Sequence, residues 1–199
     1  SREDKKIEFL DFGCGWGDDI KNAELLGFKS FGTEINEEKI NYLKKNNIKL
    51  ANLRKEKKLY DIILCNQVFE HIEKPLEVAK LVSSNLKTDG ILIVAVPNGN
   101  FIKYLLKIPF LWLIKGKGFW SMNPIWFFGH INCFSIKSLT KVFEKQSTKL
   151  CSIFFSDHLK VLNLFETRAE KLSLLFFIIK MKLNLKTLLY FRKVSKHHK

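Results

Sequence analysis

One short segment constrains this chain most: Leu-Asp-Phe-Gly-Cys-Gly-Trp-Gly-Asp at positions 10–18, in which glycines occupy three alternate positions. It continues an apolar run at positions 7–12, which has the pattern of a short buried strand. Glycine adopts backbone conformations that other residues avoid, and it lets the chain approach a ligand closely. The pattern therefore predicts a strand that ends in a ligand-binding turn.

An acidic residue at the end of the next predicted strand extends this prediction. Glu34 follows Gly13 by 21 residues, a spacing that places a carboxylate to take both hydroxyls of a ribose. A dinucleotide site favours G-x-G-x-x-G and a positive helix start, because it holds a pyrophosphate. Here the spacing is G-x-G-x-G, and Asp18 and Asp19 follow at once. This acidic edge favours S-adenosylmethionine, which has no phosphate and carries a sulfonium cation.

The rest of the first half alternates between strand-like and helix-like segments. We expect strands at 7–12, 28–34, 60–65 and 91–96, a weak strand at 48–50, and helices at 18–26, 36–46 and 76–86. Asp89-Gly90 is a turn signal before the last of these strands. Such alternation predicts an α/β fold with a doubly wound, mostly parallel sheet.

The second half is less regular. Here we expect a helix at 135–145 capped by Ser135, a strand at 150–155, a basic apolar helical region at 159–182, and a last strand at 188–192. We interpret the chain as a single domain over 1–199. It would comprise a cofactor-binding half at 1–100, an apolar basic insert at 101–130 that caps the site, and a basic part at 131–199.

Charge is distributed unevenly along the 199 residues, whose net charge is +14. Residues 1–100 contain 16 Lys or Arg and 16 Asp or Glu, whereas residues 101–199 contain 18 and 4. A basic half of this kind favours an anionic partner such as a lipid surface, a nucleic acid or a phosphorylated substrate. A general enrichment in solvated lysine is the alternative explanation.

The cysteines and the apolar runs indicate the cellular compartment of the protein. The four cysteines, at positions 14, 65, 133 and 151, show no paired spacing, so the sequence indicates neither a zinc site nor a disulfide scaffold. A cytoplasmic location is the simplest expectation, with peripheral attachment to the inner face of the membrane left open. The longest nearly unbroken apolar run, Leu172 to Ile179, falls short of the roughly 20 residues that span a bilayer.

Several ordered segments resemble class I S-adenosylmethionine-dependent methyltransferases. Residues 10–17 resemble their first motif, residues 60–72 their fourth-strand segment, and residues 86–93 the segment before their fifth strand. Gly-His-Ile-Asn-Cys-Phe-Ser at 129–135, with Ser138-Leu139, is similar to a substrate-side segment of the branch that includes ubiquinone-biosynthesis O-methyltransferases. The resemblance runs from the first predicted strand to about residue 155.

The resemblance implies a set of cofactor-binding residues. The glycine loop at positions 13–17 would line the methionine and adenosyl groups with Gly13, Cys14 and Gly15, and Asp11 would brace this loop. Glu34 would hold the ribose, and Ile35 would pack on the adenine. The residues after the 60–65 strand would contact the methionine end. The full set is Asp11, Gly13, Cys14, Gly15, Gly17, Glu34, Ile35, Asn66 and Gln67. Cys14 as a small residue that fits the turn, and Ile35 as a core residue, are the alternatives.

Three further residues are candidates for catalysis. Glu70 and His71 occupy the position of a Glu-His pair in the related branch, where a Glu three residues earlier joins them in a proposed metal site. That position is Gln67 here, and an amide is a poorer ligand, so we expect no metal. His71 is a candidate general base because its pKa lies near working pH. The alternative is that the pair only braces a loop, and a substrate-facing or structural role is open for His130.

The sequence thus predicts a methyltransferase that acts on a small or lipid-linked hydroxyl, such as a quinone-like compound, a glycan precursor or a lipid. A nucleic-acid methyltransferase is less favoured. The segment after the 60–65 strand lacks the Asn/Asp-Pro-Pro-aromatic motif of base N-methylating enzymes, and the basic half is strongly apolar. A membrane-associated binding module that retains the fold is the third reading. The sequence does not specify an oligomeric state.

Overall fold

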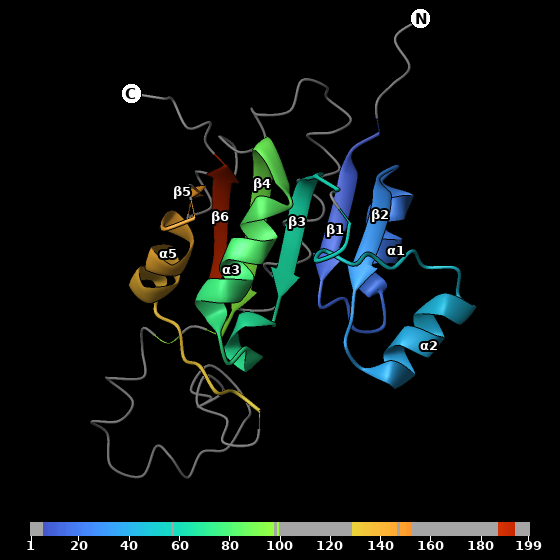
Figure 1. The fold of residues 1–199 in the computed structure, drawn as a ribbon, viewed down its shortest axis with the longest axis horizontal. Coiled ribbons are helices and arrows are strands. Elements are labelled where there is room, and N and C mark those ends of the chain that lie inside the picture. Colours follow the sequence, from blue (N-terminus) through green and yellow to red (C-terminus); the bar gives the residue numbers. More distant parts are fainter. Residues whose placement is uncertain are drawn as a thin grey trace, which may run out of the picture.

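A computed structural model describes residues 6–56, 58–97, 99, 129–146, 148–152 and 187–193. Its centre is a six-stranded sheet with the strand order β2-β1-β3-β4-β6-β5 (Figure 1). Neighbouring strands run parallel from β2 to β4, whereas β6 is antiparallel to both β4 and β5. The expected α/β fold with a mostly parallel sheet is therefore confirmed.

The strands agree well with the sequence pattern. Their bounds are β1 Glu8–Phe12, β2 Lys29–Thr33, β3 Tyr60–Asn66, β4 Leu86–Val96, β5 Thr148–Ser152 and β6 Thr187–Lys193. The weak strand expected at 48–50 is reduced to one parallel bridge between Leu50 and Gly32. Because β1 lies between β2 and β3, its glycine loop and the end of β3 meet at one edge of the sheet.

Alternating side chains on the central strands build two apolar layers. In β3, Ile63 and Cys65 belong to one core cluster, together with Ala79 and Val82. Ile62 and Leu64 belong to a second core cluster, together with Ala23. Successive side chains of a strand point to opposite faces, so β3 must be apolar along almost its whole length.

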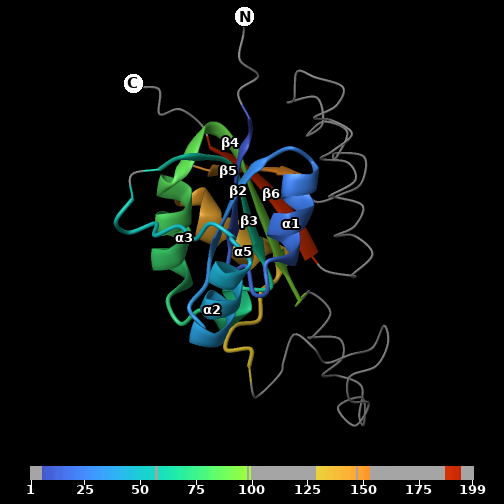
Figure 2. The ribbon, with the colours of Figure 1, turned by 90° about the vertical axis from the view of Figure 1, so that its right-hand side faces the viewer.

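The helices cover both faces of this sheet. They are α1 Asp18–Leu25, α2 Glu37–Lys45, α3 Pro75–Ser84 and α5 Ile136–Glu144, with the short 3₁₀ helix η1 Phe69–His71 before α3. Seen along the sheet, α1 lies on one side, and α3 and α5 lie on the other (Figure 2). Leu43 of α2 packs with Ile20 of α1 and with Cys14 of the glycine loop, so α2 closes the core beside that loop.

The start of β4 differs from the prediction. The sequence indicated a helix to Leu86 and a strand only from Ile91, whereas α3 ends at Ser84 and β4 begins at Leu86, which pairs with Tyr60. Asp89 has a left-handed φ of 64°, and the β3–β4 register shifts between Tyr60 and Ile62. The Asp-Gly turn signal therefore marks an irregularity within one strand and not a loop before it.

The cap of α5 is as predicted. The Ser135 hydroxyl accepts a hydrogen bond from Ser138 N, and the Ser138 hydroxyl accepts one from Ser135 N. Phe143 of this helix contacts Phe69 edge to face, with ring centroids 4.9 Å apart. A helix from the second half of the chain thereby supports η1, which follows β3.

Several expectations fall outside the described residues. These are the insert at 101–130 up to residue 128, the helical region at 159–182 and the end of the strand expected at 150–155. The subdivision of the chain, the capping role of the insert and its contact with a membrane remain predictions. Within the described residues, no helix is both long enough and apolar enough to cross a bilayer.

Candidate functional site

The glycine loop turns sharply because all three of its glycines have positive φ. The φ angles of Gly13, Gly15 and Gly17 are 78°, 56° and 80°. Residues with a side chain rarely adopt such values. A Cβ at Gly13 would come within 2.7 Å of Val68 Cγ2. The loop therefore needs glycine both for its conformation and, at Gly13, for its contact with the segment after β3.

Two hydrogen bonds to one carbonyl fasten this loop to the end of β2. Gly13 N and Cys14 N donate to Thr33 O over 3.0 and 2.9 Å, and Gly13 N also donates to the Thr33 hydroxyl. Gly15 N then donates to Glu34 Oε2 over 2.9 Å. Glu34 is thereby held against the loop, with its other oxygen accepting from Ile35 N and Asn36 N.

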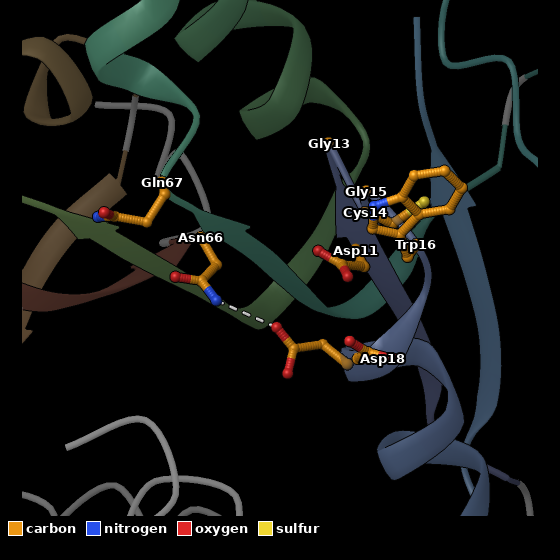
Figure 3. Close-up of a pocket in the computed structure, with 9 residues that line it drawn as sticks. Asp11, Gly13, Cys14, Gly15, Trp16, Asp18, Asn66 and Gln67 are labelled. Atoms are coloured by element: carbon orange, nitrogen blue, oxygen red, sulfur yellow. Dashed lines mark hydrogen bonds between the residues drawn. The ribbon is translucent and has the colours of Figure 1, made fainter. Parts of the chain in front are cut away.

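The loop and the end of β3 enclose a cleft of about 270 Å³ at the carboxyl edge of the sheet. This is the edge at which open α/β sheets bind their ligands. Figure 3 shows the carboxylates of Asp11 and Asp18 on the side of the glycine loop, with Asn66 across from them. The lining residues are Asp11, Gly13, Cys14, Gly15, Trp16, Asp18, Asp19, Asn66 and Gln67.

Negative charge is concentrated in this cleft. Asp11 is only 2% exposed, and its burial, together with Asp19 and Glu34, holds the pKa of its carboxyl well above the ordinary value. Burial of the Cys14 thiol raises its pKa to about 12, and the neighbouring carboxylates of Asp11 and Glu34 add to this effect. Cys14 is therefore a neutral thiol, and a cation in the cleft would relieve the repulsion among the carboxylates.

Asn66, the last residue of β3, faces the aspartates across the cleft, whereas the carboxamide of Gln67 extends away from Asp11 and the glycine loop (Figure 3). Asn66 Nδ2 donates to Asp19 Oδ2 over 3.1 Å, which fixes the Asp19 carboxylate at the start of α1. Gln67 has a positive φ of 58°, and its backbone N–H donates to Ala95 O of β4. The two amides thus stand at the end of the strand opposite the glycine loop.

Six of the nine residues expected to bind the cofactor line the cleft, whereas Gly17, Glu34 and Ile35 do not. Gly17 is the N-cap of α1, and both its left-handed φ and the close approach of Leu43 and Ile48 require glycine there. Glu34 borders the cleft through its bond to Gly15. Ile35 is 96% exposed, so the alternative that it belongs to the core is wrong.

Four contributors were absent from the predicted set. Trp16, Asp18 and Asp19 line the cleft, and Thr33 anchors the loop. The two aspartates had a signal, since they follow the glycines directly. Trp16 is 44% exposed and stands edge-on to Tyr42, with ring centroids 5.1 Å apart. Thr33 acts mainly through its backbone carbonyl, and sequence carries little information about such contacts.

The three candidate catalytic residues come together although they are far apart in the sequence. The ligand-type atoms of Glu70, His71 and His130 all lie within 4.8 Å of one another, and the two imidazole rings are 4.9 Å apart. Glu70 is 1% exposed, whereas His71 is exposed. A carboxylate with two imidazoles is a donor set that also suits a divalent metal, so the expected absence of metal stays a prediction.

Backbone hydrogen bonds hold this cluster in place. Ile131 N and Asn132 N both donate to Glu70 O, and the Asn132 amide donates to the carbonyls of Phe69 and Ile72. His71 Nδ1 bonds to Gly129 O over 2.5 Å. Since a carbonyl only accepts, Nδ1 carries the proton and Nε2 is left with its lone pair.

Comparison with known proteins identifies the family. A family model described as a methyltransferase domain matches residues 1–149, about three quarters of the chain. The chain belongs to this methyltransferase family. The resemblance to class I S-adenosylmethionine-dependent methyltransferases is confirmed at this level.

Curated relatives and solved structures agree with the family. A ubiquinone biosynthesis O-methyltransferase of Rickettsia bellii is 31% identical over 112 residues, which cover 51% of this chain and 47% of the relative. The chain therefore aligns with about half the length of this relative. A methyltransferase from Archaeoglobus fulgidus superposes with a TM-score of 0.58 at 17% identity, over 95% of this chain and 87% of that one.

A third comparison supports the fold. The O-methyltransferase from a polyketide synthase of Brevibacillus brevis, solved with S-adenosyl-L-homocysteine, superposes with a TM-score of 0.58 at 16% identity. The match covers 96% of this chain and 67% of that one. Such distant structures share the fold of this methyltransferase domain, with the glycine loop at the carboxyl edge of its sheet.

Replacing Asp11 by asparagine is expected to stabilise the methyltransferase domain at neutral pH. Because the folded pKa of Asp11 is raised, its contribution to stability is fully present below its ordinary pKa of 3.8 and is lost as the pH rises toward the folded pKa. Asparagine does not ionise, so Asp11→Asn removes this loss of stability. The free energy of unfolding at pH 7 should increase by more than the ~0.5 kcal/mol of a typical surface change.

Urea unfolding of Asp11→Asn at pH 4 and pH 7 checks this expectation. The gain over the wild type should shrink toward pH 4. Glu24→Gln, at an exposed position of α1, is the matched control and should alter stability little at either pH. A wild type as stable as Asp11→Asn at pH 7 would contradict the proposed charge repulsion in the cleft.

Proposed function

We propose that this chain binds S-adenosylmethionine in the cleft and transfers its methyl group to a hydroxyl of a small or lipid-linked acceptor. The observation that carries the proposal is the acidic cleft itself, built from the glycine loop, three aspartates and the loop-bound Glu34. The relatives that align with half of this chain are named as O-methyltransferases of ubiquinone biosynthesis. Their name supports an oxygen acceptor.

The chemistry of the cleft fits this cofactor. S-adenosylmethionine, when bound, supplies a methyl group on a positively charged sulfur. Asp11, Asp18 and Asp19 line the cleft, and none of them takes part in an ion pair among the described residues. Carboxylates without a protein cation favour a positively charged ligand and repel a pyrophosphate. The cleft therefore favours the sulfonium cofactor over a dinucleotide.

Individual residues then take the roles that the resemblance implies. Gly13, Cys14 and Gly15 line the methionine and adenosyl groups, and Asp11 braces the loop beneath them. Glu34 takes the ribose hydroxyls, which fits a carboxylate already oriented by Gly15 N. The exposed Ile35 packs on the adenine, and Asn66 and Gln67 contact the methionine end.

For the acceptor, we propose His71 as the general base. Its Nδ1 proton is directed at Gly129 O, so Nε2 is the atom that can take a proton. Glu70 and His130 lie beside it, with the ligand-type atoms of all three residues within 4.8 Å of one another. Methyl transfer from a sulfonium needs mainly alignment and exclusion of water, so the contribution of this base is moderate.

Removing the Glu34 carboxylate should weaken cofactor binding. Calorimetric titration with S-adenosylhomocysteine is expected to give micromolar affinity for the wild type and at least tenfold weaker affinity for Glu34→Ala, because the ribose loses its partner and Gly15 N its acceptor. Glu38→Ala removes an exposed carboxylate from α2 and should leave the affinity within about twofold. Equal affinity of wild type and Glu34→Ala would contradict the assigned site.

Replacing His71 tests the base. With catechol as the hydroxyl probe, His71→Gln should lower the turnover number about 100-fold, because the hydroxyl proton loses its acceptor. Dialysis against EDTA should leave the wild-type rate unchanged. A metal-dependent rate, or an unchanged turnover number in His71→Gln, would assign the cluster to metal binding or to structure instead.

A further inference from the structure

Trp16 brings a large aromatic side chain into the glycine loop. It lines the cleft, yet 44% of its surface stays exposed. Apart from Cys14, the other side chains that line the cleft are carboxylates and amides. Figure 3 shows the indole beside Gly15, across the cleft from Asn66 and Gln67. Trp16 therefore offers the cleft an aromatic surface that a ligand can cover.

Neighbouring residues hold the indole in place. The residues before and after Trp16 are glycines with positive φ, which fix the turn of the backbone. Tyr42 of α2 meets the indole edge to face, with ring centroids 5.1 Å apart and an interplanar angle of 88°. The Tyr42 hydroxyl accepts a hydrogen bond from Lys21 Nζ over 3.4 Å. A side chain that is ordered before the ligand arrives loses little conformational entropy on binding.

The hydrogen bond between Gly15 and Glu34 sets the position of Trp16 relative to the ribose. Gly15 N donates to Glu34 Oε2 over 2.9 Å, and Trp16 and Ile35 each follow one of these two partners in the chain. Consecutive Cα atoms lie about 3.8 Å apart, so both residues start directly beside the carboxylate that takes the ribose hydroxyls. Ile35 is 96% exposed. Two exposed apolar side chains thus border the proposed ribose site.

We infer that Trp16 packs against the adenosyl group of the cofactor, so that the nucleoside lies between the indole and Ile35. Adenine has an apolar π face, and bases stack on aromatic side chains in this way in many complexes. The carboxylates of the cleft attract the cofactor's positive charge but offer little apolar surface to its uncharged base. The inference rests on the proposed function and adds a residue that recognises the nucleoside part of the cofactor.

The methionine end and the acceptor are less suitable partners for Trp16. Asn66 and Gln67, which take the methionine end in the proposed function, lie across the cleft from the indole (Figure 3). His71, the proposed base for the acceptor, follows Gln67 by four residues. The indole is therefore assigned to the side of the cofactor that is remote from the reacting methyl group.

Two ligands that share the adenosyl group test the inference by calorimetric titration. 5′-Methylthioadenosine has the nucleoside and the sulfur of S-adenosylhomocysteine but lacks its amino-acid group. Trp16→Leu should weaken the binding of both ligands by the same factor, about tenfold, because the lost contact is to their common part. Trp16→Phe keeps an aromatic face and should bind both within about threefold of the wild type. Leu25→Ala changes an exposed apolar residue of α1 outside the cleft lining and should leave both affinities unchanged.

Nuclear Overhauser effects detect the contact in the wild type itself. At saturating S-adenosylhomocysteine, the indole protons of Trp16 should show Overhauser effects to the adenine H2 or H8 or to the ribose H1′ of the ligand. The Trp16 signals are assigned by their absence from the spectrum of Trp16→Phe. This measurement does not depend on the stability of a variant, so it decides the inference even if Trp16→Leu fails to fold.

The contrary results are distinct from one another. A loss of affinity for S-adenosylhomocysteine alone in Trp16→Leu would place the indole at the methionine end and overturn the inference. Equal affinities of the wild type and Trp16→Leu, equal losses in Trp16→Phe and Trp16→Leu, or the absence of the Overhauser effects would also overturn it. A folded wild type that binds neither ligand would instead refute the proposed function.

Discussion

Two hydrogen bonds to the carbonyl of Thr33 organise the candidate site. Because Gly13 N and Cys14 N both donate to this one oxygen, the turn after β1 is fixed to the end of β2. Gly15 N then reaches the carboxylate of Glu34, and α1 starts where its aspartates border the cleft. If this turn opened, the cleft would lose its wall and Glu34 its orientation.

Carboxylates have opposite electrostatic surroundings at the two ends of the sheet. At the amino end, Glu8 and Asp61 are paired with Lys87, and Lys58 lowers the pKa of Glu8 against the opposing effect of its partial burial. At the carboxyl end, the buried Asp11 lies among like charges, and its pKa is raised. The paired end contributes to stability, whereas the unpaired end costs stability that a cationic ligand would restore.

Local patterns predicted much of this, and tertiary contacts account for the rest. The glycine turn, Glu34 and the Ser135 cap depend on short spacings, so the sequence indicated them correctly. The start of β4 at Leu86 depends on pairing with Tyr60, which overrides the Asp-Gly turn signal. His71 and His130 were each candidates, but their contact requires Gly129 and Asn132 to bond across to η1, and no local pattern encodes that.

Whether the acidic cleft is an S-adenosylmethionine site can be seen in a crystal structure of the complex with S-adenosylhomocysteine. We expect the ligand in the cleft, with its ribose on Glu34, its adenine on Ile35 and its sulfur facing the side of Gln67 and His71. A ligand bound elsewhere, or well-ordered crystals grown at saturating ligand with the cleft empty, would contradict the claim.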